Sequence, residues 1–335
     1  MSSESSHARP LRVLVLAGGP SAEREISLQS GQAVAHALAS RGHAVTSYDP
    51  RQEQLTGVEA SRFDVAFVAL HGRYGEDGGV QAQLKSMGLP YTGSGPAASA
   101  LAFSKSAAKA RFREHGVSTP AAVSFHQGEP ITECIRRAAS LGFPVVVKPD
   151  RQGSSLGISF ASHPDALAAS IETALAFDTQ GLIEVAIVGE EWTVPLLDEL
   201  VLPPIRIGTP LAFFDYEAKY LREDTAYEFP EDICPELLAR LQSTSQLAAR
   251  SLGVTSLSRV DLRVDAIGQP WVLEVNTVPG LTDHSLAPKS AARMGLTLAR
   301  FCEEICQRAI DSHRDQISRH DRQVTPGHAA IRQAS

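Results

Sequence analysis

Two stretches near the end of the chain carry oxygen-bearing side chains in a pattern that favours a metal site. Residues 258–264 (SRVDLRV) and 271–280 (WVLEVNTVPG) alternate apolar and polar positions, and a turn-rich spacer separates them. This pattern predicts an antiparallel hairpin, whose pairing gathers three side chains on one face: Asp261, Glu274 and Asn276. Three hard oxygen ligands with no His or Cys beside them suit Mg²⁺.

An alternative interpretation explains the same polar face without a metal. Carboxylates opposed across two strands repel each other unless a cation lies between them, and Arg259 and Arg263 on the first strand supply positive charge. The two carboxylates alone do not separate these interpretations, but Asn276 runs directly into a Thr-Val-Pro-Gly loop and so favours the metal site. On the second strand, Leu273 and Val275 are predicted to face the core.

A glycine- and serine-rich stretch, 151–157 (RQGSSLG), lies between two predicted strands. It lacks the Walker A pattern and no helix follows it, but its backbone N–H groups can still turn toward an anion. A plain hairpin turn is the alternative. Lys148 ends the apolar run just before it, where a charge needs an anionic partner or a route to water, so together they predict a phosphate clamp. Lys105 is either a second clamp cation or an exposed helix lysine.

Several other polar residues have two interpretations on sequence alone. Glu184 and Glu191 flank a pair of predicted strands and either bond a ribose hydroxyl or are solvated. Glu23 and Glu25 lie in the first turn of a predicted helix, where acidic residues complement the helix dipole without any functional role. His71, in a Gly-rich loop, is equally open.

The composition is that of an ordinary globular protein of 335 residues, with 43% hydrophobic and 21% charged residues. The net charge of −7 argues against nucleic acid or an anionic membrane as the main partner. No CxxC pair occurs among the four cysteines, which favours a reduced, cytoplasmic setting. Residues 1–10 lack the apolar stretch of a signal peptide, and the apolar run 11–19 is too short to span a bilayer.

The first hundred residues alternate strand and helix. Strands are predicted at 11–19, 43–50 and 63–70, with a helix at 22–40. This order predicts an open parallel α/β domain of the Rossmann-like type, in which ligands bind at the carboxyl ends of the strands. The loops GGPSAERE and HGRYGEDGG both follow such strand ends.

The rest of the chain mixes helices with pairs of strands. Helices are predicted at 97–116, 164–177, 235–253 and 297–311, a strand at 141–150, and two strands around Gly189 within 181–198. The long segment 205–230 has no clear period and is predicted to be a mobile cover. The tail 312–335 and the first ten residues are predicted to be disordered.

Seven motifs together resemble those of the D-alanine–D-alanine ligases, a family of the ATP-grasp superfamily. They are GGPSAERE, ALHGRYGEDG, PYTGSG, VKPDRQGSSLG, DYEAKY, SRVDLRV and EVNTVPGLTDHS, in an order and spacing similar to that family from about Leu11 to about Asp311. The resemblance implies an α/β ATP-grasp fold with three units at 11–100, 101–183 and 184–311. It also implies a cytoplasmic homodimer that serves peptidoglycan synthesis, with D-alanine and ATP as its small-molecule partners.

The resemblance assigns the nucleotide and metal ligands. Lys105 and Lys148 would bind phosphates under the flap residues Gly153, Ser154 and Ser155. Segment 184–187 would line the adenine, and Glu191 would bond the ribose. The residues implied in nucleotide binding also include Glu184, Ala186, Ile187 and Lys219. Asp261, Glu274 and Asn276 would hold two Mg²⁺ ions, or Mn²⁺, with Glu274 bridging.

The resemblance also assigns the amino-acid site. Glu23 would receive the ammonium of the first D-alanine and connect through Ser154 to Tyr220 on the cover, with His71 nearby. Arg259 and the Gly280 N–H would stabilise the oxyanion. Ser285 and Leu286 would take the second substrate's carboxylate at a helix start, where anions are favoured.

The implied reaction has two steps. The carboxylate of the first D-alanine attacks the γ-phosphate of ATP and forms an acyl phosphate, and the amine of the second D-alanine then displaces phosphate. Positioning and charge neutralisation do most of this work. The chain departs from the family twice: Ala186 stands where relatives often carry an aromatic residue, and Ser104 where they often carry Asp.

Three alternatives remain at this point. A ligase for D-lactate or D-serine is the nearest, although Tyr220 argues against D-lactate because depsipeptide ligases of the family lack that tyrosine. A nucleotide-binding module without catalysis is disfavoured by the complete set of predicted metal, phosphate and substrate residues. A dinucleotide-dependent dehydrogenase is disfavoured because GGPSAERE lacks GxGxxG. ATP turnover that depends on added D-alanine separates a ligase from the last two, and competition between D-alanine and D-lactate across pH tests the first.

Overall fold

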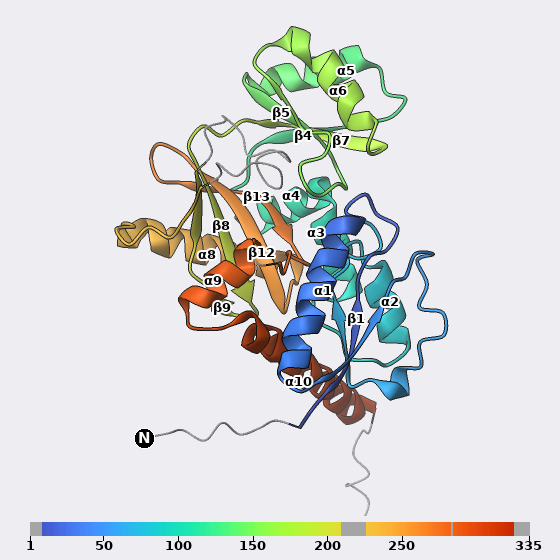
Figure 1. The fold of residues 1–335 in the computed structure, drawn as a ribbon. Helices are drawn as coiled ribbons and strands as arrows, with labels where there is room; N and C mark the ends of the chain where they lie inside the picture. The colour runs from blue at the N-terminus through green and yellow to red at the C-terminus, as the bar shows by residue number, and fades with distance from the viewer. Residues whose placement is uncertain (1–8, 209–225, 283, 325–335) are drawn as a thin grey trace, which may run out of the picture.

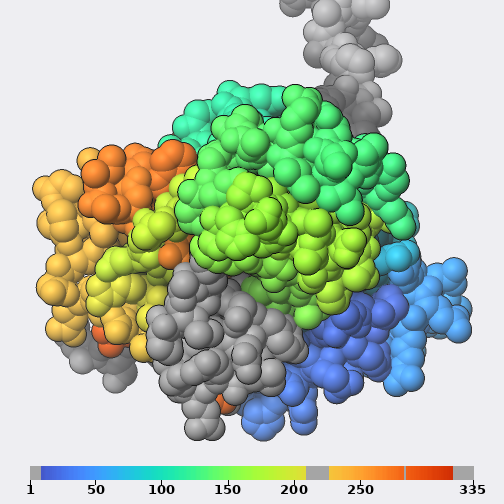
Figure 2. Space-filling view, turned by 90° about the horizontal axis from the view of Figure 1, so that it is seen from above, coloured from blue at the N-terminus to red at the C-terminus, as the bar shows by residue number. Residues whose placement is uncertain are grey.

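The computed structural model describes residues 9–208, 226–282 and 284–324. Three sheets, each with its own helices, follow one another along the chain (Figure 1). Seen from above, the residues of the central sheet and its helices meet the N-terminal residues on one side and the C-terminal strands on the other (Figure 2). Predicted site residues come from all three parts, so their arrangement decides whether one site can form.

The N-terminal sheet is parallel, as predicted, with strand order β2-β1-β3. Its strands are β1 (Arg12–Leu16), β2 (Ala44–Tyr48) and β3 (Val65–Val68). Helices α1 (Arg24–Ser40) and α10 (Leu298–Val324) pack on one face and α2 (Gly79–Ser86) on the other. Both faces are buried, which is why β1 reads as one continuous apolar run.

The central sheet is antiparallel, in the order β4-β7-β5-β6. Its strands are β4 (Ala122–His126), β5 (Val145–Pro149), β6 (Ser159–Ala161) and β7 (Gln180–Val185). Helices α5 (Ile131–Ala138) and α6 (Leu167–Leu175) pack on it. The glycine-rich flap is the connection between β5 and β6, and it therefore projects from the sheet just after the strand that carries Lys148.

The C-terminal sheet has the order β11-β10-β8-β12-β13, with β9 paired to β8. Its strands are β8 (Glu190–Leu197), β9 (Leu200–Val201), β10 (Ile205–Gly208), β11 (Ala226–Glu228), β12 (Leu257–Val264) and β13 (Pro270–Asn276). Helix α8 (Pro235–Leu252) packs on one face and ends at Gly253, whose φ of +70° is the left-handed conformation that glycine favours at a helix end. Helix α9 (Leu286–Arg293) follows the hairpin.

The predicted hairpin forms, but it contains a β-bulge. Asp261 pairs with Glu274 and Leu262 pairs with Val272, so Leu273 is an extra residue on β13. Val272 therefore joins the core beside Val275, whereas Leu273 is only half-buried. The prediction that Leu273 faces the core is wrong because a bulge interrupts the strict alternation on which it rested.

The helix predicted at 97–116 is two helices, α3 (Pro96–Phe103) and α4 (Lys105–Glu114). Ser104 separates them in an extended conformation (φ −86°, ψ 107°), and its hydroxyl accepts a hydrogen bond from the Ala107 N–H. Serine is a strong N-cap residue, so the break lies where a cap is available. Lys105 consequently becomes the first residue of a helix.

The last helix continues beyond Asp311, where the sequence predicted its end, to Val324. The predicted disorder over 312–335 is therefore wrong for its first part, and residues 325–335 lie outside the described residues. The added turns are polar, and an Asp311–Arg314 ion pair (3.5 Å) lies on them. Extending a formed helix adds one backbone bond per residue and needs no apolar face, which composition alone does not reveal.

Candidate active site

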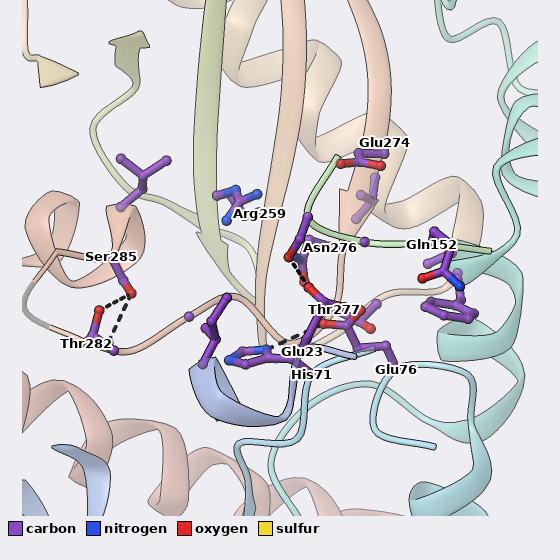
Figure 3. Close-up of a pocket in the computed structure, with 18 of the residues that line it drawn as sticks. Glu23, His71, Glu76, Gln152, Arg259, Glu274, Asn276, Thr277, Thr282 and Ser285 are labelled. Carbon is purple, nitrogen blue, oxygen red and sulfur yellow. Dashed lines mark hydrogen bonds and ion pairs between the residues drawn. The ribbon is translucent and has the colours of Figure 1, made fainter. Parts of the chain in front are cut away.

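A pocket lies where the flap, the N-terminal domain and the β12–β13 hairpin meet. Figure 3 shows Glu23, His71 and Glu76 on one side of it, with Arg259 and Glu274 on the other. Gln152 of the flap and Ser285 at the start of α9 lie at opposite ends of the view. The described residues that line this pocket include these predicted site residues: Glu23, His71, Lys105, Gly153, Ser154, Arg259, Glu274, Asn276, Gly280, Ser285 and Leu286.

Glu23 precedes α1 and reaches the flap. Its carboxylate accepts a hydrogen bond from the Ser154 hydroxyl. A Cβ atom added at Gly72 or at Gly153 would lie 2.7 Å from Glu23 Oε2, so both loops need glycine to let the carboxylate approach their backbones. The structure thus joins the N-terminal domain to the flap at the carboxylate predicted to bind the first ammonium.

His71 is held between two groups that sequence reasoning did not select. The Leu281 N–H donates to Ser30 Oγ (3.4 Å), and Ser30 Oγ lies 3.0 Å from His71 Nε2. On the other side of the ring, His71 Nδ1 lies 3.6 Å from Glu76 Oε1. The two ring nitrogens of His71 thus face a serine hydroxyl on one side and a carboxylate on the other.

Glu76 also lines the pocket, on the same side as Glu23 and His71, and sequence reasoning missed it. Burial raises its pKa to about 7, against the opposing hydrogen bond with His71, and the charge of Glu23 also raises it. A buried acid with a perturbed pKa in a cleft is a functional candidate. Its sequence signal was available, because Glu76 lies in the HGRYGEDGG loop after β3.

The flap has an unusual backbone. Ser154 and Ser155 both have positive φ (51° and 58°), and Gly157 follows at 73°. Left-handed conformations cost a non-glycine residue about 1 kcal/mol or more and concentrate in functional loops. The flap is therefore held in a strained, compact turn, and the Ser154 bond to Glu23 is one contact that stabilises it.

The hairpin carboxylates are paired with cations. Arg259 donates to both Asp261 oxygens, Nε to Oδ1 at 2.8 Å and one terminal nitrogen to Oδ2 at 2.7 Å, and Thr193 Oγ1 donates to Oδ1 at 2.6 Å. Lys105 Nζ lies 3.3 Å from Glu274 Oε2. Arg263 instead faces Glu191 (3.4 Å) and the Gly189 carbonyl (2.7 Å).

The positions of Asp261, Glu274 and Asn276 show whether these three side chains fit divalent ions. Asp261 and Glu274 are register partners and Asn276 follows on the same strand, so their oxygens share one region. Within the described part of the chain, no group of three or more His, Cys, Asp or Glu could hold a metal alone. Mg²⁺ usually takes one or two carboxylates and completes its shell with water and substrate phosphate, and two carboxylates with one amide fit that pattern.

Lys105 is not the exposed helix lysine that was one of its two interpretations. It is only 7% exposed, and its Nζ donates to the Gln152 carbonyl of the flap at 2.6 Å. Lys148 is equally buried and pairs with Glu184. The two predicted clamp lysines thus flank the flap, one from α4 and one from β5.

Asp150 explains how the chain accommodates Ser104. Its carboxylate, 1% exposed, accepts hydrogen bonds from the Ser106 N–H (2.7 Å) and the Ser104 hydroxyl (2.7 Å). The Asp150 carbonyl also accepts from the Lys105 N–H at 3.1 Å. Asp150 thus supplies, from the flap side, a carboxylate at the start of α4, the place where relatives often carry Asp.

The residues predicted to bind the second substrate gather at the start of α9. Ser285 precedes this helix, and its Oγ accepts a hydrogen bond from the Thr282 N–H at 3.0 Å. A Cβ atom on Gly280 would lie 2.8 Å from Ser285 Oγ, so the loop and the helix start are in close contact. Of the remaining predicted residues, Ala186 is buried and Ile187 half-buried, while Lys219 and Tyr220 lie outside the described residues.

Comparisons with known proteins decide the family. The D-ala D-ala ligase N-terminus model matches residues 46–94, and the D-ala D-ala ligase C-terminus model matches residues 113–307. A D-alanine–D-alanine ligase of Halorhodospira halophila (strain DSM 244 / SL1) is 44% identical over 299 residues, which cover 89% of this chain and 96% of that protein. This chain belongs to the D-alanine–D-alanine ligase family.

Solved structures agree with this. A D-alanine–D-alanine ligase from Bacillus anthracis, complexed with ATP, is similar with a TM-score of 0.81 and 31% identity, covering 91% of this chain and 99% of that one. The VanG D-Ala:D-Ser ligase from Enterococcus faecalis is similar with a TM-score of 0.78 and 28% identity, covering 89% and 98%. The predicted ATP-grasp fold and the predicted enzyme class, an ATP-dependent ligase, are confirmed. No described helix of this ligase is long and apolar enough to cross a membrane.

Proposed function

We propose that this ligase joins two D-alanine molecules into D-alanyl-D-alanine for peptidoglycan synthesis, with ATP converted to ADP and phosphate. One observation carries the proposal for this chain's own residues. The Glu23–Ser154 contact, Arg259 and Glu274 all border one pocket, and Asp261 is the register partner of Glu274 on β12. An ammonium, a carboxylate and a phosphate can therefore meet there.

The first substrate binds by its ammonium at Glu23, and Glu76 lies close enough for the charge of Glu23 to raise its pKa. This orientation turns the substrate carboxylate toward Lys105 and the flap. The carboxylate oxygen attacks the γ-phosphorus, the bond to the β–γ bridging oxygen breaks, and ADP leaves with that oxygen. Lys105 and Lys148 neutralise the phosphate charge and hold the reacting groups in line.

Asp261, Glu274 and Asn276 would hold two Mg²⁺ or Mn²⁺ ions. When bound, such ions neutralise the phosphate oxygens and orient the triphosphate. Before the ions bind, Arg259 balances the charge of Asp261 and Lys105 balances that of Glu274. Bound metal ions would replace these two side-chain cations as partners of the carboxylates. Phosphate oxygens that enter the site can take over the two side-chain cations.

The second substrate completes the reaction. Its carboxylate binds at Ser285 and Leu286, where the start of α9 favours an anion, and its free amine attacks the acyl carbon. Arg259 and the Gly280 N–H stabilise the oxyanion, each donor contributing about 3 kcal/mol. The oxyanion then collapses, phosphate leaves and the amine loses its proton. The flap limits the access of water, which would hydrolyse the acyl phosphate.

The setting of the enzyme follows from its chemistry. We place it in the cytoplasm, where ATP is supplied and where its four free cysteines stay reduced. We also propose a homodimer, as the family resemblance implies. Size-exclusion chromatography with light scattering tests the oligomeric state.

D-Serine is a second candidate for the attacking amine, because the similar VanG structure is a D-Ala:D-Ser ligase. The purified protein is incubated with ATP, Mg²⁺ and D-alanine, alone or with D-serine or D-lactate, and products are identified by mass spectrometry. We expect D-alanyl-D-alanine, ADP and phosphate, and no product from L-alanine. Folded protein that forms no dipeptide from D-alanine would reject the proposal, and a predominant mixed D-Ala-D-Ser product would replace it with the second candidate.

A further inference from the structure

Lys109 is a buried lysine outside the pocket, and the family resemblance gave it no role. It lies one turn after Lys105 on α4, and only 1% of it is exposed. Burying an ammonium costs several kcal/mol unless it is paired and hydrogen-bonded. A lysine kept in such a place must therefore be held by specific partners.

Its direct partners lie on the central sheet and in the loop before β4, and one of them contacts the C-terminal sheet. Lys109 Nζ lies 2.8 Å from Glu184 Oε2 on β7, and it donates to Thr119 Oγ1 at 2.7 Å and to the Pro120 carbonyl at 3.3 Å. The Thr119 hydroxyl in turn donates to the Val272 carbonyl of β13 at 2.8 Å. Figure 1 shows α4 between the central sheet and β13. One ammonium thus connects the central sheet to the strand that carries Glu274.

Glu184 divides its carboxylate between two lysines. Oε2 faces Lys109, while Oε1 accepts from Lys148, one of the two predicted phosphate ligands. With Lys148 alone, Glu184 would form a neutral pair and weaken the attraction of that lysine for phosphate. With Lys109 present, the buried cluster carries a net positive charge, which favours an anion beside Lys148.

We propose that Lys109 is a positioning residue for nucleotide binding: it orients and charge-balances Glu184, so that Lys148 remains aligned and available to phosphate. Lys109 acts through Glu184 and does not touch the nucleotide. The inference rests on the proposed function in one respect, namely that Lys148 contacts ATP.

The proposal predicts that nucleotide affinity depends on pH. Burial lowers the pKa of Lys109 to about 8, with Glu184 opposing and with Lys148 and Arg113 lowering it further. These three are the charged groups that face Lys109, from β7, from β5 and from α4 itself. Lys109 is charged below that pH and loses its charge above it, so nucleotide affinity should fall as the pH rises through about 8.

The test is calorimetric titration of the full chain with a non-hydrolysable ATP analogue and Mg²⁺, together with KM values for ATP and for D-alanine. Lys109→Met should weaken analogue binding by about tenfold or more, as loss of a charge-assisted contact does, and leave the KM for D-alanine within about twofold. Arg111→Met is the matched control: it removes an exposed positive charge from the same helix, one that pairs with Glu114 at 2.9 Å, and should change neither.

Two further variants keep the test decisive if Lys109→Met does not fold. Lys109→Arg keeps its charge at high pH, so its analogue affinity should stay flat from pH 7 to 9, where the wild type weakens. Thr119→Val keeps the lysine and removes one of its acceptors, so a smaller loss, about threefold, is expected.

The outcomes separate this inference from the proposed function. Wild-type protein that binds no analogue rejects the function itself. Wild-type protein that binds while Lys109→Met binds equally well overturns the role of Lys109 and leaves the function standing. Equal losses for ATP and D-alanine, or an Arg variant that weakens with pH like the wild type, would assign Lys109 to the fold alone and also overturn the inference.

Discussion

The two walls of the pocket treat their carboxylates differently. On the N-terminal wall, Glu23 and Glu76 contact a hydroxyl and an imidazole, and within the described residues neither forms a salt bridge with a lysine or arginine. On the hairpin wall, Asp261 and Glu274 each face a strong cation, Arg259 and Lys105. In the proposed reaction, Glu23 on the first wall keeps its negative charge for a substrate ammonium, whereas the carboxylates of the second wall stay balanced until metal ions and phosphate would bind. Similar side chains thus acquire different roles from their partners.

The largest effect should come from the hairpin wall. Asp261→Ala and Glu274→Ala should each reduce kcat by about a thousandfold or more, because phosphoryl transfer depends on neutralised phosphate charge. Phosphate release at saturating ATP and D-alanine measures this, with circular dichroism to verify the fold. Glu274→Gln should recover part of the activity at raised Mg²⁺, and unchanged turnover in either alanine variant would remove the metal assignment.

The next effect should come from the opposite wall and should differ in kind. Glu23→Gln removes the charge that binds the first ammonium, so the KM for D-alanine should rise by about a hundredfold while analogue binding stays the same. Glu25→Gln, on the exposed side of the same helix turn, is the matched control and should behave as the wild type. A Glu23 variant that loses nucleotide affinity instead would contradict the division of labour between the walls.

The pH dependence of the free energy of unfolding tests whether Glu76, on the N-terminal wall, has the raised pKa that distinguishes it from the ion-paired carboxylates of the hairpin wall. Its pKa is raised to about 7 in the folded protein, above the ordinary value near 4.5 of the unfolded chain. The folded state therefore keeps a proton that the unfolded state has lost, and the free energy of unfolding should fall by about 3 kcal/mol as the pH rises through that window. Denaturant titrations at pH 4.5, 6 and 7.5 measure this. Glu76→Gln should flatten the profile, and a wild-type profile that is already flat would refute the raised pKa.

The smallest effect concerns how Asp150 positions Lys105, the lysine that pairs with Glu274 on the hairpin wall. Asp150→Ser removes the carboxylate at the start of α4, which carries Lys105, and should lower kcat/KM for ATP by about tenfold. Adding Ser104→Asp supplies a carboxylate from the other side of the same contact and should restore most of the loss. If the double variant is no better than the single one, the pair does not act as a unit.

The sequence predicted best where one local rule decides the structure. The parallel strands of the first domain, the flap and the pairing of Asp261 with Glu274 follow from apolar periodicity and turn residues. The prediction for Leu273 failed because a bulge depends on how both strands pack, which a two-residue period does not encode.

The missed residues have long-range partners in common. Glu76, Lys109 and Asp150 are ordinary charged residues in the sequence, and their partners come from other elements of the fold. Burial gives each its role, and burial of a polar side chain is the quantity that a single sequence reveals least. The one sequence signal available for Glu76 and Asp150 is that each lies inside a recognised motif.

The last helix of the ligase completes the core of its first domain. Phe301, Cys302 and Ile305 of α10 pack with Val13 and Phe67 of the N-terminal sheet, and Glu303 binds Arg41 and His43 at the end of α1. During synthesis, one apolar face of the N-terminal sheet therefore lacks the cover of α10 until about three hundred residues have left the ribosome. The N-terminal domain is the first to be translated and among the last to finish folding, so a prematurely terminated chain should be aggregation-prone rather than partly active.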